Sequence, residues 1–169
     1  YGGCALDCQW AARCGDGALD IEHEQCDEGP LNGMVMESTE LASCNSGCRW
    51  YGRIVFISSK TYDGNFDTPI GADLTCQELA FYAGFQQYER FRAWISDSWT
   101  APHDRFEYTL DDDVPYILPN GRIIVGDYAD LVASGPQTGI SITEAGDILH
   151  ERNVWTNTTF YGKVTDPEP

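Results

Sequence analysis

Residues 53–84 read RIVFISSKTYDGNFDTPIGADLTCQELAFYAG, and this stretch decides the fold class because two periodicities follow one another in it. Residues 53–58 hold a continuous apolar run, which predicts a largely buried β-strand. After a loop marked by Asp-Gly, residues 71–84 predict a helix that ends at a left-handed Gly84 cap. One face of this helix carries the apolar stripe Ala72, Cys76, Leu79, Ala80 and Ala83.

Short strand and helix signals continue along the chain. Residues 91–96 alternate in polarity and predict a second strand. The turn sequence Pro119-Asn120-Gly121 predicts a hairpin that joins residues 116–118 to residues 122–125. Further short elements are expected at residues 129–133 (helix) and 154–156 (strand). One good helix among short strands predicts an α+β fold.

The first 50 residues differ in composition from the rest. Residues 1–50 carry nine acidic and two basic side chains, hold six of the seven cysteines and lack a clear period. Residues 51–169 contain most of the aromatic and β-branched side chains. A segment with so little core depends on covalent cross-links. We therefore expect a disulfide-rich module at 1–50, joined at Trp50-Tyr51-Gly52 to a domain at 51–169.

The chain is strongly acidic, with 27 Asp and Glu against 10 Lys and Arg in 169 residues and a net charge of -17. Such a field repels a nucleic-acid backbone and an anionic membrane surface. No apolar run approaches the roughly 20 residues that a membrane helix needs. We expect no nucleic-acid partner and no membrane insertion.

Cysteine usage indicates an oxidising compartment. The spacings do not match zinc-ligand pairs, and His23 is the only nearby imidazole, so a disulfide framework is favoured over zinc. The framework cysteines are Cys4, Cys8, Cys14, Cys26, Cys44 and Cys48, and their pairing stays open. Cys76 is left over as a buried free thiol, a link to the first module or a bridge to another chain.

The chain opens at Tyr1 and shows no signal-peptide segment, which fits a mature exported product. We expect a secreted or cell-surface protein.

The cysteine-rich segment carries Cys14-Gly15-Asp16-Gly17, then Glu24-Gln25-Cys26-Asp27-Glu28-Gly29, then Cys44 and Cys48. This pattern resembles one unit of a cysteine-rich repeat that is common in secreted proteins of myxobacteria and their relatives. It departs from that family between Pro30 and Leu41, where Gly33-Met34-Val35-Met36-Glu37 replaces a short Asn/Asp-rich loop. Cys4 and Cys8 look like the closing pair of a preceding unit.

Residues 53–162 carry a second set of motifs, Val55-Phe56-Ile57-Ser58-Ser59, Tyr62-Asp63-Gly64-Asn65, Gly71-Ala72-Asp73 with Cys76, Ala93-Trp94-Ile95-Ser96-Asp97-Ser98 and Val154-Trp155-Thr156. This set resembles an uncharacterised extracellular bacterial domain related to endostatin and the C-type-lectin-like fold. The resemblance implies one or two helices packed on twisted, mostly antiparallel strands. It does not imply an activity, because a fold does not fix a function.

Three departures from that family matter. The late cysteine that would pair with Cys76 is missing, and so is the histidine cluster of the endostatin zinc site. The sugar-and-calcium signatures of C-type lectins (Glu-Pro-Asn, Gln-Pro-Asp, Trp-Asn-Asp) are also absent. Carbohydrate binding by the lectin route is therefore not supported.

A contact site is predicted in the loops that follow residues 91–96. Trp99 lies between Ser98 and Thr100, and such a ring can stack on a sugar or anchor a protein interface. The alternative is that Trp99 plugs its own loop. The predicted contact residues are Trp99, His103, Asp104, Asp111, Asp112 and Asp113.

Calcium is the one cofactor that the residues allow, because Ca²⁺ takes carboxylate oxygens. The predicted metal ligands are Asp63, Asp67 and Asp73, and two further acidic groups are Asp111-Asp112-Asp113 and Asp16, Asp27 and Glu28. No stretch matches an EF-hand, and a solvated acidic surface is favoured over a calcium site. Asn157 heads an N-x-Thr sequon, which allows N-glycosylation.

Catalytic motifs are missing. The three histidines, His23, His103 and His150, stand in unrelated contexts, and no Gly-x-Ser-x-Gly or His-Glu-x-x-His run occurs. We therefore expect a non-enzymatic extracellular adhesion or ligand-binding module whose partner is a protein or glycan at the cell surface. The alternative is a structural subunit that assembles with copies of itself into a filament or sheath through its termini.

Overall fold

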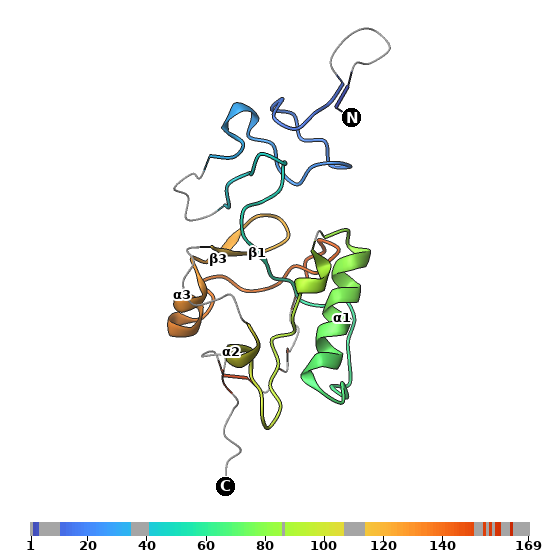
Figure 1. Ribbon diagram of the computed structural model, residues 1–169, viewed down its shortest axis with the longest axis vertical. Coiled ribbons are helices and arrows are strands. Elements are labelled where there is room, and N and C mark those ends of the chain that lie inside the picture. Colours follow the sequence, from blue (N-terminus) through green and yellow to red (C-terminus); the bar gives the residue numbers. More distant parts are fainter. Residues whose placement is uncertain are drawn as a thin grey trace.

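The computed structural model describes residues 2–3, 11–34, 41–85, 87–106, 114–150, 154, 156, 158, 159 and 163. Within them the protein is a small α+β structure with a three-stranded sheet, one main helix and two disulfides, as expected at this coarse level (Figure 1). The elements are η1 (Gly29–Leu31), β1 (Arg53–Ile54), α1 (Pro69–Tyr82), η2 (Tyr88–Arg90), α2 (Pro102–Arg105), β2 (Tyr116–Ile117), β3 (Ile123–Val125) and α3 (Tyr128–Ser134). In this part of the chain no helix has the length and apolar character to cross a membrane.

The main helix, α1, is confirmed and begins two residues earlier than expected. Thr68 caps its N-terminus by accepting a hydrogen bond from the Gly71 amide, and a proline occupies the first helical turn, where its missing N–H costs nothing. Gly84 follows the helix with φ +76°, the left-handed conformation predicted for it. The inner face buries Ala72 and Ala80, so the helix packs through small side chains.

The predicted hairpin is confirmed as β2 and β3, which pair antiparallel. Its turn is closed by hydrogen bonds between Leu118 and Arg122 (2.8 Å) and between Gly121 and Leu118 (2.9 Å). β1 pairs parallel to β2, with Arg53 opposite Tyr116, which gives the order β1-β2-β3. The sheet is therefore mixed.

The largely buried strand expected at 53–58 is confirmed only over its first two residues. Only Arg53 and Ile54 belong to β1, and Ile57 makes an isolated parallel bridge to Thr143. Residues 54–57 are half-buried because one side of them lines a cavity instead of a packed layer.

The expected strand at 91–96 is also wrong. This segment has no ladder partner, because the amide of Ala93 donates to the Asp73 carboxylate (2.7 Å) and the amide of Ser96 to the Thr156 carbonyl (3.0 Å). In the predicted last strand, Val154 and Thr156 are not in a strand, and Trp155 lies outside the described residues.

The second predicted helix is confirmed as α3, with Asp127 accepting a hydrogen bond from the Asp130 amide (2.7 Å) as its N-cap. α3 packs on the sheet and closes the main apolar core. That core comprises Tyr116, Leu118, Ile124, Val125, Tyr128, Leu131 and Ile142.

The cysteine-rich segment has a separate small core of Cys26, Cys44 and Cys48, with Cys14 and Trp50 against it. It meets the hairpin turn directly: the Ala42 amide donates to the Gly121 carbonyl (2.8 Å). Gly121 has φ +82°, and a Cβ there would lie 2.5 Å from the Trp50 ring. Only glycine therefore allows Trp50 to pack against this turn.

Candidate functional site

The loop before α2 presents Trp99 to solvent. The Asp97 carboxylate oxygen Oδ1 accepts hydrogen bonds from the amides of Trp99 (2.8 Å) and Thr100 (2.7 Å) and from the Thr100 hydroxyl (3.0 Å). This Asx turn fixes the backbone while the Trp99 side chain stays 89% exposed. Trp99 is therefore not a plug for its own loop. The two backbone hydrogen bonds hold the pKa of Asp97 below its ordinary value.

The short helix α2 continues from this loop and carries two more predicted contact residues. The Asp104 carboxylate accepts a hydrogen bond from the Ala101 amide (3.1 Å), which closes the first turn. The His103 ring is exposed and stacks on buried Tyr128 with a centroid distance of 6.5 Å. We call residues 97–104 the tip. It lies at the opposite end of the described structure from the cysteine-rich segment, drawn in blue (Figure 1).

A buried ion pair anchors the tip to α1. Nη2 of Arg105 lies 2.7 Å from the Asp73 carboxylate and also donates to the Ala93 carbonyl (2.7 Å), while Nη1 donates to the Ile95 carbonyl (3.2 Å). Arg105 thereby joins α2, α1 and the irregular segment between them.

Burial dominates the titration of this pair. It raises the pKa of Asp73, against the opposing effects of the Ala93 amide and the Arg105 and Arg92 guanidinium groups. Burial likewise lowers the pKa of Arg105, although Asp73 acts to raise it. Each charge is therefore tolerated because the other is present.

The predicted calcium ligands Asp63, Asp67 and Asp73 are not brought together at ligand spacing. Asp73 is engaged in the ion pair, and Asp63 lies in an exposed loop where it accepts a hydrogen bond from the Asn65 amide (3.0 Å). Asp67 has φ +57°, an exposed turn conformation. Asp63 therefore stabilises its own loop and Asp73 a tertiary contact, and the three residues do not form a calcium site.

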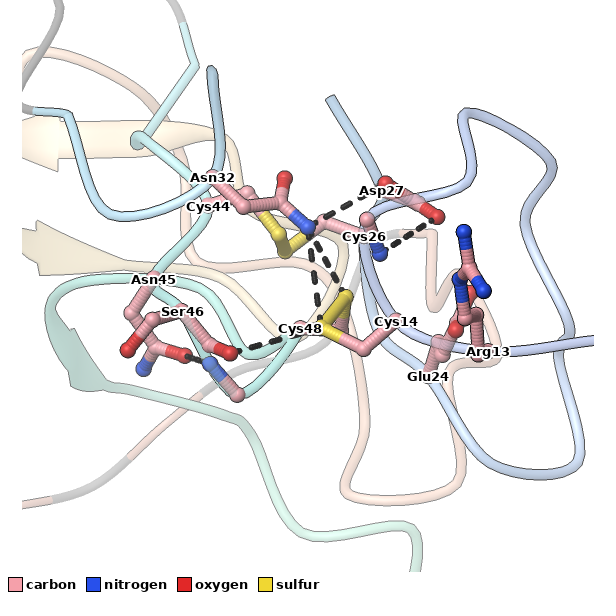
Figure 2. The surroundings of a disulfide bond; sticks show 12 residues. Arg13, Cys14, Glu24, Cys26, Asp27, Asn32, Cys44, Asn45, Ser46 and Cys48 are labelled. Carbon is pink, nitrogen blue, oxygen red and sulfur yellow. Dashed lines mark hydrogen bonds between the residues drawn. A yellow bond between two sulfur atoms is a disulfide. The ribbon is translucent and has the colours of Figure 1, made fainter. Parts of the chain in front are cut away.

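The cysteine-rich segment is organised around Asp27 (Figure 2). Its oxygen Oδ2 accepts hydrogen bonds from the amides of Gly15, Asp16 and Gly17, each 3.1 Å long. Its oxygen Oδ1 accepts from the Gly29 amide (2.7 Å) and the Asn32 side chain (3.1 Å). Desolvation acts to raise the pKa of Asp27, but these hydrogen bonds outweigh it and lower the pKa.

Two disulfides flank this carboxylate: Cys14–Cys48 and Cys26–Cys44. Nδ2 of Asn32 lies 2.9 Å from Cys48 Sγ, so one amide group bridges the carboxylate and a disulfide (Figure 2). Cys4 and Cys8 lie outside the described residues.

One group of three described side chains has metal-ligand spacing, namely Glu24, Asp27 and Cys48. Cys48 has no thiolate to offer because it is in a disulfide, and Asp27 already accepts five hydrogen bonds. Asp16 and Glu28, grouped with Asp27 from the sequence as candidate calcium ligands, are also engaged. Asp16 accepts a hydrogen bond from the Ala18 amide (2.9 Å), and Glu28 accepts one from the Cys44 amide (3.2 Å). The chemistry of this donor set opposes a cation.

Cys76 carries a free thiol on the inner side of α1. Burial, followed by the nearby Asp73 carboxylate, raises its pKa to about 11. The thiol is therefore protonated at neutral pH and is a poor nucleophile.

Three predicted site residues, Asp111, Asp112 and Asp113, lie outside the described residues, as does Asn157. The structure adds Asp97 and Arg105, which sequence reasoning missed. Asp97 had a local signal, since an aspartate two residues before an exposed position is typical of an Asx turn. Arg105 had none, because its partner is 32 residues away.

Comparisons with protein-family models, curated proteins and solved structures found no match to this chain.

Proposed function

We propose that the protein is a non-enzymatic extracellular binding module that contacts a cell-surface protein or glycan through the tip. The single observation that carries this proposal is Trp99, 89% exposed on a backbone held by three hydrogen bonds to Asp97. A large aromatic side chain on a fixed backbone loses little conformational entropy on binding, and tryptophan is enriched among residues that dominate interface energies.

Other features of the protein, outside the tip, support the proposal. Disulfides form and persist in oxidising compartments, which favours an extracellular location. The mixed sheet with one main helix is compatible with the proposed lectin-like identity of residues 51–169. The Cys76 thiol is protonated at neutral pH, which argues against its acting as a nucleophile.

The test uses the intact, non-reduced chain on an array of defined glycans and on an array of purified extracellular proteins. Trp99→Ala should weaken the strongest interaction at least about tenfold, the loss expected for a residue that dominates an interface. The matched control is Ile21→Ala, which removes an apolar side chain of comparable accessibility from the cysteine-rich segment. Equal binding by wild type and Trp99→Ala, with folding intact, would falsify the proposal.

A second function, self-assembly into an extracellular structure, is favoured by the outer face of α1. Its side chains Ile70, Leu74, Phe81 and Tyr82 are each more than half exposed. The helix has no Lys or Arg, and its only carboxylate besides buried Asp73 is Glu78. Two copies of a chain with net charge -17 would meet least repulsion along this face.

If α1 mediates assembly, light scattering will show a mass that rises with protein concentration. Leu74→Arg would then return the protein to its 18.8 kDa monomer, whereas Trp99→Ala would not. A concentration-independent monomer rejects this second function.

A further inference from the structure

A large cavity lies beneath α1, away from the exposed Trp99 ring. Its volume is about 1070 Å³, and its walls come from the inner face of α1, residues 52–64, residues 90–95 and the core around α3. This volume slightly exceeds the roughly 300–1,000 Å³ found for small-molecule sites. Apolar side chains that line it include Ile54, Phe56, Leu79, Phe91, Trp94, Leu131 and Ile140.

The cavity exists because the two walls do not fill the space between them. Of the four α1 side chains that line the cavity, Ala72, Thr75 and Cys76 are small, and Leu79 is the exception. Opposite them, residues 54–57 form an apolar run that stays half-exposed. Covering that surface with a hydrocarbon would be favourable by about 25 cal/mol per Å² of apolar area.

Among the described residues that line the cavity, the net charge is opposite in sign to that of the whole chain. The described residues that line it include four cations (Arg53, Lys60, Arg90 and Arg92) and one carboxylate, Asp63. The chain as a whole has 10 basic and 27 acidic side chains. An apolar ligand with a negative end therefore matches both the walls and their charge.

The arrangement of the cations favours a position near η2 for the negative end of the ligand. Lys60 follows Ser59, whose amide donates to the buried Glu144 carboxylate (2.9 Å), so an anion there meets a like charge. At the other rim the nearby Asp73 carboxylate is already paired with Arg105 (2.7 Å). There, Nη1 of Arg92 donates to the carbonyls of Glu89 (2.7 Å) and Phe91 (2.9 Å), which orients the guanidinium.

Arg92 retains donors for a ligand. Its Nε is 3.8 Å from the Asp73 carboxylate, and no described residue accepts a hydrogen bond from its Nη2. Arg90 lines the same rim two residues earlier.

We propose that this cavity binds a single-chain amphipathic anion, with the hydrocarbon tail between α1 and residues 54–57 and the headgroup at Arg90 and Arg92. A fatty acid and a single-chain phospholipid share this chemistry, so the test includes a carboxylate and a phosphate headgroup. This site is distinct from the tip, and its failure leaves the proposed function untouched.

The test is calorimetric titration of the intact, non-reduced chain with decanoate, dodecanoate, dodecyl phosphate and dodecanol, all below their aggregation concentrations. We expect one saturable site for the anions. Affinity should rise about fourfold for each added methylene, so dodecanoate should bind roughly 15-fold more tightly than decanoate. Whichever of dodecanoate and dodecyl phosphate binds more tightly identifies the preferred headgroup.

Substitutions test the contacts of the headgroup and of the hydrocarbon tail separately. Arg90→Gln combined with Arg92→Gln should weaken anion binding at least about tenfold and leave dodecanol unchanged, since charge-assisted hydrogen bonds are lost. Arg122→Gln, an exposed cation that does not line the cavity, is the matched control. Cys76→Phe should block every ligand, whereas Cys76→Ser should not.

The proposal is overturned if neither dodecanoate nor dodecyl phosphate shows saturable binding, or if dodecanol binds as tightly as both of them. It is also overturned if the Arg90 and Arg92 double variant binds them with unchanged affinity. These outcomes decide the question even if Cys76→Phe does not fold.

Discussion

The cysteine-rich segment and the domain that follows it are held together by different forces. In residues 11–50 the centre is polar: one carboxylate, Asp27, gathers five hydrogen bonds beside two disulfides. From residue 51 onward the centre is the apolar cluster around Tyr128, with one buried ion pair, Asp73–Arg105, at its side. The difference shows how a segment with little apolar material can still adopt a defined structure.

This contrast also bears on function. Covalent and polar cross-links hold the cysteine-rich segment together, whereas Trp99 and the described residues that line the cavity all lie after residue 51. Each half should therefore respond to a different perturbation.

Reduction of the two disulfides should have the largest effect. Loss of a native bridge from a small domain costs about 2–5 kcal/mol. Hydrogen exchange should show loss of protection at residues 11–34 and 41–50, while α1 and the β2–β3 hairpin stay protected. Cys76→Ser is the control: because Cys76 belongs to neither disulfide, this variant should lose the same protection on reduction as the wild type. Simultaneous loss of protection in α1 would contradict the contrast.

Removal of the buried cation should come next. Arg105→Met leaves Asp73 buried without its partner and should lower the free energy of unfolding by about 3 kcal/mol, measured by urea denaturation. Asp73→Asn combined with Arg105→Met should recover part of this loss, because no unpaired charge remains. A double variant less stable than Arg105→Met would show that the ion pair is not the reason for the loss.

Asp27→Asn should destabilise the cysteine-rich segment by roughly 1–3 kcal/mol at pH 7, because hydrogen bonds to a charged acceptor are weakened. The folded-state pKa of Asp27 is lowered, so its stabilising effect is present above its ordinary pKa of 3.8. That effect is lost as the pH falls through the lower folded value. Urea denaturation across this range should show wild type and Asp27→Asn converging in acid; a constant difference would contradict the assignment.

The smallest effect on stability is expected at the tip. Trp99→Ala removes a side chain that is 89% exposed, so the free energy of unfolding should change by less than about 0.5 kcal/mol. Thermal unfolding checks this directly. A large loss would mean that Trp99 packs against the protein and is not available for contact.

Local patterns predicted the parts of the fold that depend on neighbouring residues. The apolar stripe of α1 and the Pro119-Asn120-Gly121 turn depend on residues only a few positions apart, and both elements formed as expected. Residues 91–96 did not form a strand, because distant groups, the Asp73 side chain and the Thr156 carbonyl, satisfy their backbone amides.

The residues of the candidate site also divide into those that local sequence predicts and those that only the tertiary structure reveals. Trp99 was predicted as a contact residue because an aromatic residue between two small polar residues is a local feature, and the structure shows that its side chain is exposed. Asp73 was predicted as a calcium ligand because two other aspartates are close to it in sequence. Its actual partner, Arg105, comes from another helix, and only the tertiary structure places the two groups 2.7 Å apart.

The central claim is that a ligand covers Trp99, and collisional quenching of tryptophan fluorescence measures this most directly. Iodide should quench an exposed fraction of the emission that is present in wild type and missing from Trp99→Phe. Adding the tightest ligand from the arrays should remove that fraction from wild type. If the quenchable emission of Trp99 persists at saturating ligand, the tip is not the binding site.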